Sequence, residues 1–290
     1  MATRLSIAKP DIVKAFDDLP SRVLRQKDIG VVLEKQRAFW RLAQSTSLRA
    51  FITYLTESSK LRRVHFALPH RSETLFTWGD VSPFALVCAV KPGAYLCHYT
   101  AMRVHQLTLQ SPETIYANHE QRPLPPSATG LTQRGIDNAF RGKQRQTTNV
   151  CEFLSHRLCL VNGKHTGRLG VVEMQDEFGQ PYSVTGLERT LIDITVRPYY
   201  AGGVSEVMEA FRLAADRVSV NKLAATLEKM NFVYPYRQAI GFYLERSGAY
   251  DQSRLSLFKR TLFEFDFYVT YAMKKPEYSA DWRLHFPAGL

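Results

Sequence analysis

The side chains that could do chemistry in this chain favour binding over covalent catalysis. Three carboxylates, Glu173, Asp176 and Glu177, follow a predicted strand in a spacing that resembles metal-dependent nucleases. Such a site needs a lysine two residues after its second carboxylate, where this chain has Phe178 or Gly179. We therefore expect no catalytic residue and no enzyme activity, and we keep a DNA-targeted metal-dependent nuclease as an alternative.

The histidines and cysteines also lack the spacing of a metal or cofactor site. His98 and His105 lie seven residues apart around a predicted helix and complete no ligand set, so we expect structural roles for both. The chain has no C-x-x-C motif, and its four cysteines occur in apolar runs, as expected of buried free thiols in a reducing compartment. These cysteines are Cys88, Cys97, Cys151 and Cys159. The segment VNGKHTG lacks the spacing of a phosphate-binding loop. We expect no metal and no cofactor.

The strongest binding pattern is a short helix in the segment SLRAFITYLTESS. Its apolar residues recur at i, i+3, i+4 and i+7, the spacing that keeps one helical face on a core. They are Leu48, Phe51, Ile52 and Leu55. The other face is small, polar and cationic, which suits entry into a DNA major groove. The residues that we expect to contact DNA from this helix and its start are Thr46, Ser47, Arg49 and Thr53.

A predicted hairpin follows this helix, formed by KLRRVHFAL and SETLFTWG. Strand alternation should turn one of Arg62 and Arg63 outward, so we expect a phosphate contact from at least one of them. His70 and Arg71 lie at the hairpin tip, where they either reach a minor groove or the DNA backbone, or form an exposed turn without contact. Helices followed by a hairpin are the element order of a winged helix-turn-helix.

Positive charge is concentrated in the same region. From Arg22 to Arg63 there are ten Lys and Arg residues and three Asp and Glu residues, a net charge of +7 out of +11 for the whole chain. Residues 1–80 carry +6, residues 81–180 carry +3 and residues 181–290 carry +2. A charge so localised indicates a phosphate backbone as the partner. Arg37 and Arg41 flank Trp40; we expect one to pack or pair and the other to contact phosphate, without choosing between them.

The predicted elements define an α+β fold with two domains: the winged helix-turn-helix at 1–80 and a mixed α/β domain at 81–290 that is helical toward its end. A proline-rich segment at 119–130 is a possible further boundary. We expect a first helix opening at Lys9-Pro10, a second over 25–36, core anchors at Phe39 and Trp40, and a cap for the third helix at Ser45 or Thr46.

In the second domain, strands are predicted on either side of an Asn162-Gly163 turn. A capping box of Thr185 and Glu188 is predicted to open a helix, along which Arg189, Asp193 and Arg197 form intrahelical pairs or organise a functional domain. The segment FEFDFYVTY is predicted as a late strand.

Several segments resemble the AbiEi antitoxins of type IV toxin–antitoxin systems, in order along almost the whole chain. They are FWRLAQSTSLRAFITYL, AYLCHYTAMRVHQLT, NGKHTGRLGVVE, VTGLERTLIDITVRPYYAGGVSEVMEAF, YPYRQAIGFYLERSGAY and DWRLHFPAGL. The resemblance implies a transcriptional regulator whose N-terminal winged helix binds inverted repeats of operator DNA and represses its own operon. It also implies that the C-terminal domain counteracts a nucleotidyltransferase toxin, with or without direct contact, as part of an abortive-infection antiviral defence.

A single winged helix makes few base contacts, so we expect a homodimer or cooperative pairing on the two half-sites. The N-terminus lacks the apolar run of a signal peptide, and no stretch of about eighteen apolar residues occurs, so we expect a cytoplasmic protein without membrane contact. A remaining alternative is an adaptor whose winged helix binds protein instead of DNA.

Overall fold

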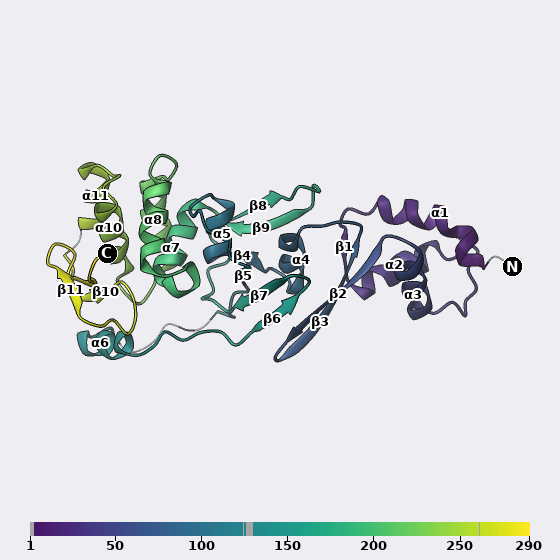
Figure 1. Ribbon diagram of the computed structural model, residues 1–290, viewed down its shortest axis with the longest axis horizontal. Coiled ribbons are helices and arrows are strands. Elements are labelled where there is room, and N and C mark those ends of the chain that lie inside the picture. The colour runs from purple at the N-terminus through teal and green to yellow at the C-terminus, as the bar shows by residue number, and fades with distance from the viewer. Residues whose placement is uncertain (1–2, 124, 126–129, 261) are drawn as a thin grey trace.

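The computed structural model describes residues 3–123, 125, 130–260 and 262–290. The chain is elongated, with the N-terminal helices at one end, a six-stranded sheet at the centre and the C-terminal helices at the other end (Figure 1). The described residues form eleven α-helices and three separate sheets, so the predicted α+β class is confirmed. Every helix in the described ranges is too short or too polar to cross a bilayer.

The N-terminal part is a three-helix unit with a hairpin. Its elements are α1 (Arg4–Asp17), β1 (Val23–Leu24), α2 (Gln26–Gln36), α3 (Leu48–Ser58), β2 (Leu61–Leu68) and β3 (Arg71–Trp78), with the strands in the order β1-β3-β2. The first helix starts earlier than predicted, because the Thr3 side chain accepts a hydrogen bond from the Ser6 backbone N–H at 3.2 Å and caps it there. Pro10 consequently lies inside the helix.

Aromatic packing holds this unit together. Phe16 packs on Trp78 with ring centroids 4.7 Å apart, and Trp40 stacks on Phe51 at 5.8 Å. Trp40 is therefore the core anchor that the sequence predicts, whereas Phe39 is 70% exposed and that prediction is wrong. The predicted cap is also wrong by one or two residues, since the N-cap of α3 is Ser47.

The hairpin lies between two cores. Leu61, Phe76 and Trp78 pack with the N-terminal helices, while Val64, Phe66 and Leu75 pack with the central sheet. Phe66 contacts Phe153 of β6 with ring centroids 4.8 Å apart. One face of the hairpin is thus buried against the rest of the chain, which its polar tip did not indicate.

The central sheet has the strand order β6-β7-β5-β4-β9-β8. Its strands are β4 (Tyr95–Leu96), β5 (Thr114–Asn118), β6 (Val150–Phe153), β7 (His156–Val161), β8 (Val171–Gln175) and β9 (Pro181–Thr185), with α4 (Pro83–Val90) and α5 (His98–Val104) packed against it. Strands from both sides of the proline-rich segment pair in this one sheet, β5 with β7; residues 124 and 126–129 of that segment lie outside the described residues.

The two strands predicted around Asn162-Gly163 do not form a hairpin. β7 pairs with β5 and β6, and β8 pairs with β9, so the two lie apart in the sheet. The glycine serves a different purpose: a Cβ at Gly163 would lie 2.7 Å from Asn118 Oδ1. The turn sequence therefore reflects a close approach of two chain segments.

The C-terminal part is a helical layer with a small sheet. Its elements are α6 (Gln133–Arg141), α7 (Leu187–Val196), a 3₁₀ turn η1 (Pro198–Ala201), α8 (Val204–Ala214), α9 (Val220–Met230), α10 (Tyr236–Arg246), α11 (Gln252–Lys259), β10 (Phe267–Tyr268), β11 (Pro276–Ser279) and β12 (Leu284–Pro287). Only Phe267–Tyr268 of the predicted late strand FEFDFYVTY is a strand.

The predicted capping box is wrong. Gly186 is the N-cap of α7, and the Thr185 hydroxyl instead bonds that of Thr190 at 2.8 Å. Glu188 accepts from the Ser219 backbone N–H at 3.1 Å and pairs with Lys222 at 2.8 Å, so it joins α7 to the start of α9.

Hydrogen bonds link the N-terminal part to the central sheet. The Arg25 guanidinium donates to the Ala89 carbonyl at the end of α4 at 2.6 Å. The Arg22 backbone N–H donates to Gln180 Oε1 at 2.7 Å, and the Ser82 N–H donates to Asp176 at 3.1 Å. Asp176, a carboxylate of the nuclease alternative, therefore joins the turn between β8 and β9 to the start of α4.

Candidate functional site

Helix α3 presents the predicted DNA-contacting side chains outward. Arg49 and Thr53 are exposed on the face opposite the buried Phe51, Ile52 and Leu55. Thr46 is half-buried just before the helix. Ser47 is exposed, but its hydroxyl oxygen accepts from the Ala50 N–H at 3.2 Å and caps the helix. The outward face is therefore available for contact, with Ser47 already committed to the backbone.

Arg37 holds the turn that leads into α3. Its guanidinium donates to the carbonyls of Ala43 at 2.8 Å and Thr46 at 3.1 Å, and pairs with Glu34. The residue is only 7% exposed, whereas Arg41 is exposed. Of the two arginines that flank Trp40, Arg37 is thus the packed one. The sequence left this choice open because both arginines border the same tryptophan.

The hairpin turns its two arginines to opposite faces. Both Arg62 and Arg63 are exposed, because the two cores that the hairpin serves lie on opposite sides of it. Arg63 lies over the Phe76 ring at 5.6 Å, on the side of α3. Arg62 pairs with Asp80 at 2.8 Å on the other side. Arg63 is consequently the arginine of the pair that shares a surface with α3.

The hairpin tip is exposed at both predicted positions, His70 and Arg71. Arg71 pairs with Glu73 at 2.8 Å, and Glu73 also faces Arg25 at 3.5 Å. Arg71 is itself exposed, whereas the Glu73 side chain that it shares with Arg25 is only 12% exposed.

Six exposed cations between residues 22 and 63 have no acidic partner among the described residues. The exposed lysines and arginines of this region that form no ion pair with another described residue are Arg22, Lys27, Lys35, Arg41, Arg49 and Arg63. A surface with this excess of unpaired positive charge attracts polyanions over distances of about 10 Å at physiological salt. We call the surface formed by α3, Arg41 and Arg63 the cationic face.

Two of the three carboxylates of the nuclease alternative, Asp176 and Glu173, already have hydrogen-bond partners. Glu173 accepts from Ser183 Oγ at 2.6 Å and pairs with Arg168 at 3.3 Å. The described residues contain no group of three histidines, cysteines or carboxylates that could hold a metal ion. The four cysteines are free thiols, three of them buried and Cys88 half-buried.

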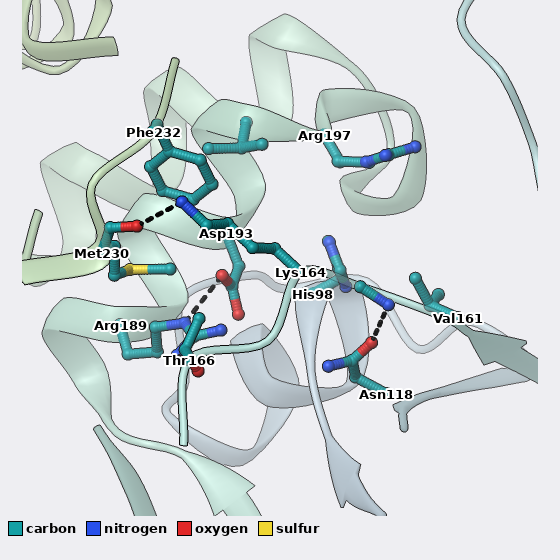
Figure 2. A pocket seen from close by; sticks show the side chains of 12 residues that line it. His98, Asn118, Val161, Lys164, Thr166, Arg189, Asp193, Arg197, Met230 and Phe232 are labelled. Atoms are coloured by element: carbon teal, nitrogen blue, oxygen red, sulfur yellow. Dashed lines mark hydrogen bonds and ion pairs between the residues drawn. The ribbon is translucent and has the colours of Figure 1, made fainter. Parts of the chain in front are cut away.

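A polar pocket opens between the central sheet and the C-terminal helices. Its volume is about 90 Å³. Figure 2 shows the Arg189–Asp193 pair beside the Lys164 side chain, with Phe232 and Met230 forming one wall. Its other lining residues include His98, Asn118, Thr166 and Arg197.

A buried ion pair supports the floor of the pocket. Arg189 is 4% exposed, and its Nε donates to Asp193 at 2.8 Å. Its Nη1 donates to the Leu169 carbonyl at 2.6 Å and to Thr166 Oγ1 at 3.1 Å. Although burial opposes its charge, the Asp193 carboxylate raises the pKa of the Arg189 guanidinium. The predicted intrahelical pair is thus present. The other hydrogen bonds of Arg189, to Thr166 and Leu169, tie α7 to the loop after β7.

His98 enters the pocket from a strained backbone. Its φ is 49°, in the left-handed region that non-glycine residues rarely adopt, and it is 6% exposed. Nδ1 lies 2.9 Å from Cys97 Sγ, and the ring packs edge-on against Tyr200. Burial lowers the pKa of His98 to about 4, so the imidazole is neutral at pH 7.

The sequence did not predict this pocket. Five of its lining residues come from three of the segments quoted for the resemblance: His98 from one, Lys164 and Thr166 from a second, and Arg189 and Arg197 from a third. The sequence shows that these segments resemble the family, but their order along the chain does not show that they come together in space.

Comparison with known proteins bears on the fold of the chain. No family model matches it, and no curated protein matches it. The crystal structure of the RV2827C protein from Mycobacterium tuberculosis is similar over 96% of this chain and 90% of that chain, with a TM-score of 0.58 and 15% sequence identity. At this identity the likeness concerns the fold alone.

Proposed function

We propose that this protein is a DNA-binding antitoxin of the AbiEi type, which represses its own operon through the N-terminal part. The observation that carries the DNA-binding half is the cationic face: Arg49 and Thr53 are exposed on α3, and Arg63 is exposed on the hairpin over Phe76, whose ring packs with the N-terminal helices. A short helix followed by a hairpin, with cations on both, is the arrangement that winged-helix proteins use on duplex DNA.

Contacts on this face divide into two kinds. In this proposal Arg49 and Thr53 reach base edges in the major groove, where arginine pairs with guanine and threonine contacts the thymine methyl group. Arg63 and Arg41 set the register through phosphates. Because one unit reaches few bases, two copies on the two arms of an inverted repeat supply the specificity.

The antitoxin half of the proposal rests on the family resemblance of the central and C-terminal segments. In this proposal they counteract a nucleotidyltransferase toxin encoded beside the gene. In this proposal the two halves are separable, because the cationic face belongs to the N-terminal part and the antitoxin half to the central and C-terminal segments.

A gel-shift titration with the DNA upstream of the gene tests repression. We expect Arg49→Glu to weaken binding by at least about tenfold, and the wild-type affinity to fall steeply between low and moderate salt. Arg134→Glu is the matched control, because Arg134 is exposed on α6, away from this face. The proposal is wrong if the DNA affinity changes neither with salt nor in the Arg49→Glu variant.

Co-expression with the adjacent toxin tests the second half. Arg49→Glu should lose repression of a reporter while cells still survive the toxin. If the chain protects against no neighbouring nucleotidyltransferase, the antitoxin assignment fails while DNA binding stands.

A further inference from the structure

The polar pocket carries more positive charge than its own residues neutralise. Three cations line it, Lys164, Arg189 and Arg197, against the single carboxylate of Asp193. Arg189 already occupies that carboxylate at 2.8 Å. His98 adds no charge at pH 7, since burial keeps its imidazole neutral. Two positive charges at the rim, Lys164 and Arg197, therefore lack a carboxylate partner within the lining.

The rim cations also keep hydrogen-bond donors free. Lys164 Nζ donates to the carbonyls of Met230, at 2.8 Å, and Asn231, which leaves a third N–H. Arg197 donates once, to the Arg145 carbonyl at 3.2 Å, and its remaining guanidinium donors bond no other described residue. Lys164 is exposed and Arg197 half-buried, so both are accessible from solvent.

The volume and the lining of the pocket limit the class of ligand that it can bind. A volume of about 90 Å³ holds a few water molecules or one small oxyanion, not a whole nucleotide. Phe232 and Met230 form an apolar wall against which an organic group can pack. Arginine and lysine together favour an oxyanion with several acceptor oxygens, and two unneutralised cations match a dianion better than a carboxylate.

We propose that this pocket binds the phosphate group of a small phosphomonoester. Arg197 holds the phosphate oxygens, and Lys164, whose amino group lies on the other side of the pocket beside Phe232 (Figure 2), adds positive charge; the organic part lies against Phe232. Arg189 is a positioning residue, because its hydrogen bonds to Asp193, Thr166 and the Leu169 carbonyl hold the floor in place. The site is independent of the proposed DNA-binding function.

Binding is tested on the full chain by calorimetry and thermal melting in a phosphate-free buffer. Inorganic phosphate, glycerol 3-phosphate, sulfate and acetate are added at equal ionic strength, balanced with sodium chloride. We expect saturable binding and a rise in melting temperature with both phosphate ligands, with glycerol 3-phosphate binding at least as tightly as phosphate. Acetate should behave as sodium chloride does.

Variants locate the site. Arg197→Gln should weaken phosphate binding by at least about tenfold, and Lys164→Gln should also weaken it. Arg260→Gln and Lys274→Gln are matched controls on exposed positions at the C-terminal end. Arg49→Gln removes a cation from the cationic face and should leave phosphate binding unchanged, which separates the two sites.

Several outcomes would overturn the proposal. They are stabilisation no greater than that from sodium chloride, equal affinity in the Arg197→Gln and Lys164→Gln variants, or acetate binding as tightly as phosphate. Loss of binding in Arg49→Gln would place the anion on the cationic face instead. Should Arg197→Gln fail to fold by circular dichroism, Lys164→Gln decides, because Lys164 is exposed and contributes only two backbone hydrogen bonds.

Discussion

The cationic face and the polar pocket use the same residue types in opposite ways. On the cationic face, Arg49 and Arg63 stand outside elements whose apolar sides form the core. In the pocket, Arg189 is inside, with four hydrogen-bond partners including Asp193. The exposed arginines are free to bind an anionic partner, whereas the charge of Arg189 is neutralised by a carboxylate within the fold.

This contrast predicts how substitutions divide between stability and binding. A cation in water loses little when it is removed, because an exposed ion pair contributes at most about 1 kcal/mol. A buried cation leaves its carboxylate unpaired in a low-dielectric environment, which costs several times more. Substitutions in the pocket floor should therefore lower the free energy of unfolding, and those on the cationic face should weaken DNA binding alone.

The largest expected effect is that of Arg189→Met. It strands the Asp193 carboxylate, so we expect a loss of about 3–5 kcal/mol in the free energy of unfolding, measured by urea denaturation. The double variant Arg189→Met, Asp193→Leu should recover much of the loss, because no uncompensated charge remains. A single variant as stable as the wild type would break the comparison.

His98 gives the pocket a pH signature. Its pKa of about 4 in the fold lies below its ordinary value of 6.5, so between these pH values the unfolded chain binds a proton that folded His98 does not. Stability from this group is therefore present above pH 6.5 and is lost as pH falls toward 4, by up to about 3 kcal/mol.

The matched variant for this pH effect is His98→Asn, since asparagine tolerates the left-handed backbone. Denaturation midpoints between pH 7 and 5 should fall less in the variant than in the wild type. His105 and His119 remain as smaller sources of slope, because burial lowers the pKa of each. Parallel profiles for the two proteins would contradict the neutral state of His98.

Arg37 tests the comparison from the other side, as a buried cation within the N-terminal part. We expect Arg37→Met to lower the melting temperature by several degrees and to weaken DNA binding, because two carbonyls before α3 lose their donor. Arg41→Met, at an exposed position, should leave the melting temperature unchanged and weaken DNA binding alone. An unchanged melting temperature for Arg37→Met would show that this turn does not depend on the guanidinium.

The smallest effects on stability concern the two hairpin arginines. Arg62→Ala and Arg63→Ala should each change the free energy of unfolding by no more than about 0.5 kcal/mol. Arg63→Ala should also lower the salt slope of DNA binding by about one, and Arg62→Ala by less, because Arg62 faces Asp80 on the opposite side. Equal slopes for both variants would mean that DNA reaches both faces of the hairpin.

Local patterns predicted much of the N-terminal part. The apolar spacing of α3, the helix over 25–36 and the hairpin were all readable, because each depends on residues close in sequence. The errors are of one kind. Phe39 is exposed, Ser47 is the cap, and Thr185 is no cap at all, because tertiary contacts chose among neighbours with similar propensities.

Around the pocket, the partners of two residues differ from those that local sequence patterns predict. The predicted turn at Asn162-Gly163 was assigned to a hairpin, but its glycine is needed where the chain approaches Asn118. Glu188 was assigned to a cap, but it bonds Ser219, thirty-one residues away. Both residues belong to local patterns, but their partners, Asn118 and Ser219, lie far away along the chain.

By itself the sequence determined the α+β class, the concentration of charge near the N-terminus and the outward face of α3, since these depend on composition and short-range periodicity. Only the tertiary structure decided that Arg37 is buried and Arg41 exposed, that Arg62 and Arg63 lie on opposite sides of the hairpin, and that His98, Lys164 and Arg197 line one pocket. The physical reason is that burial and charge pairing depend on contacts between distant segments, which periodicity does not encode.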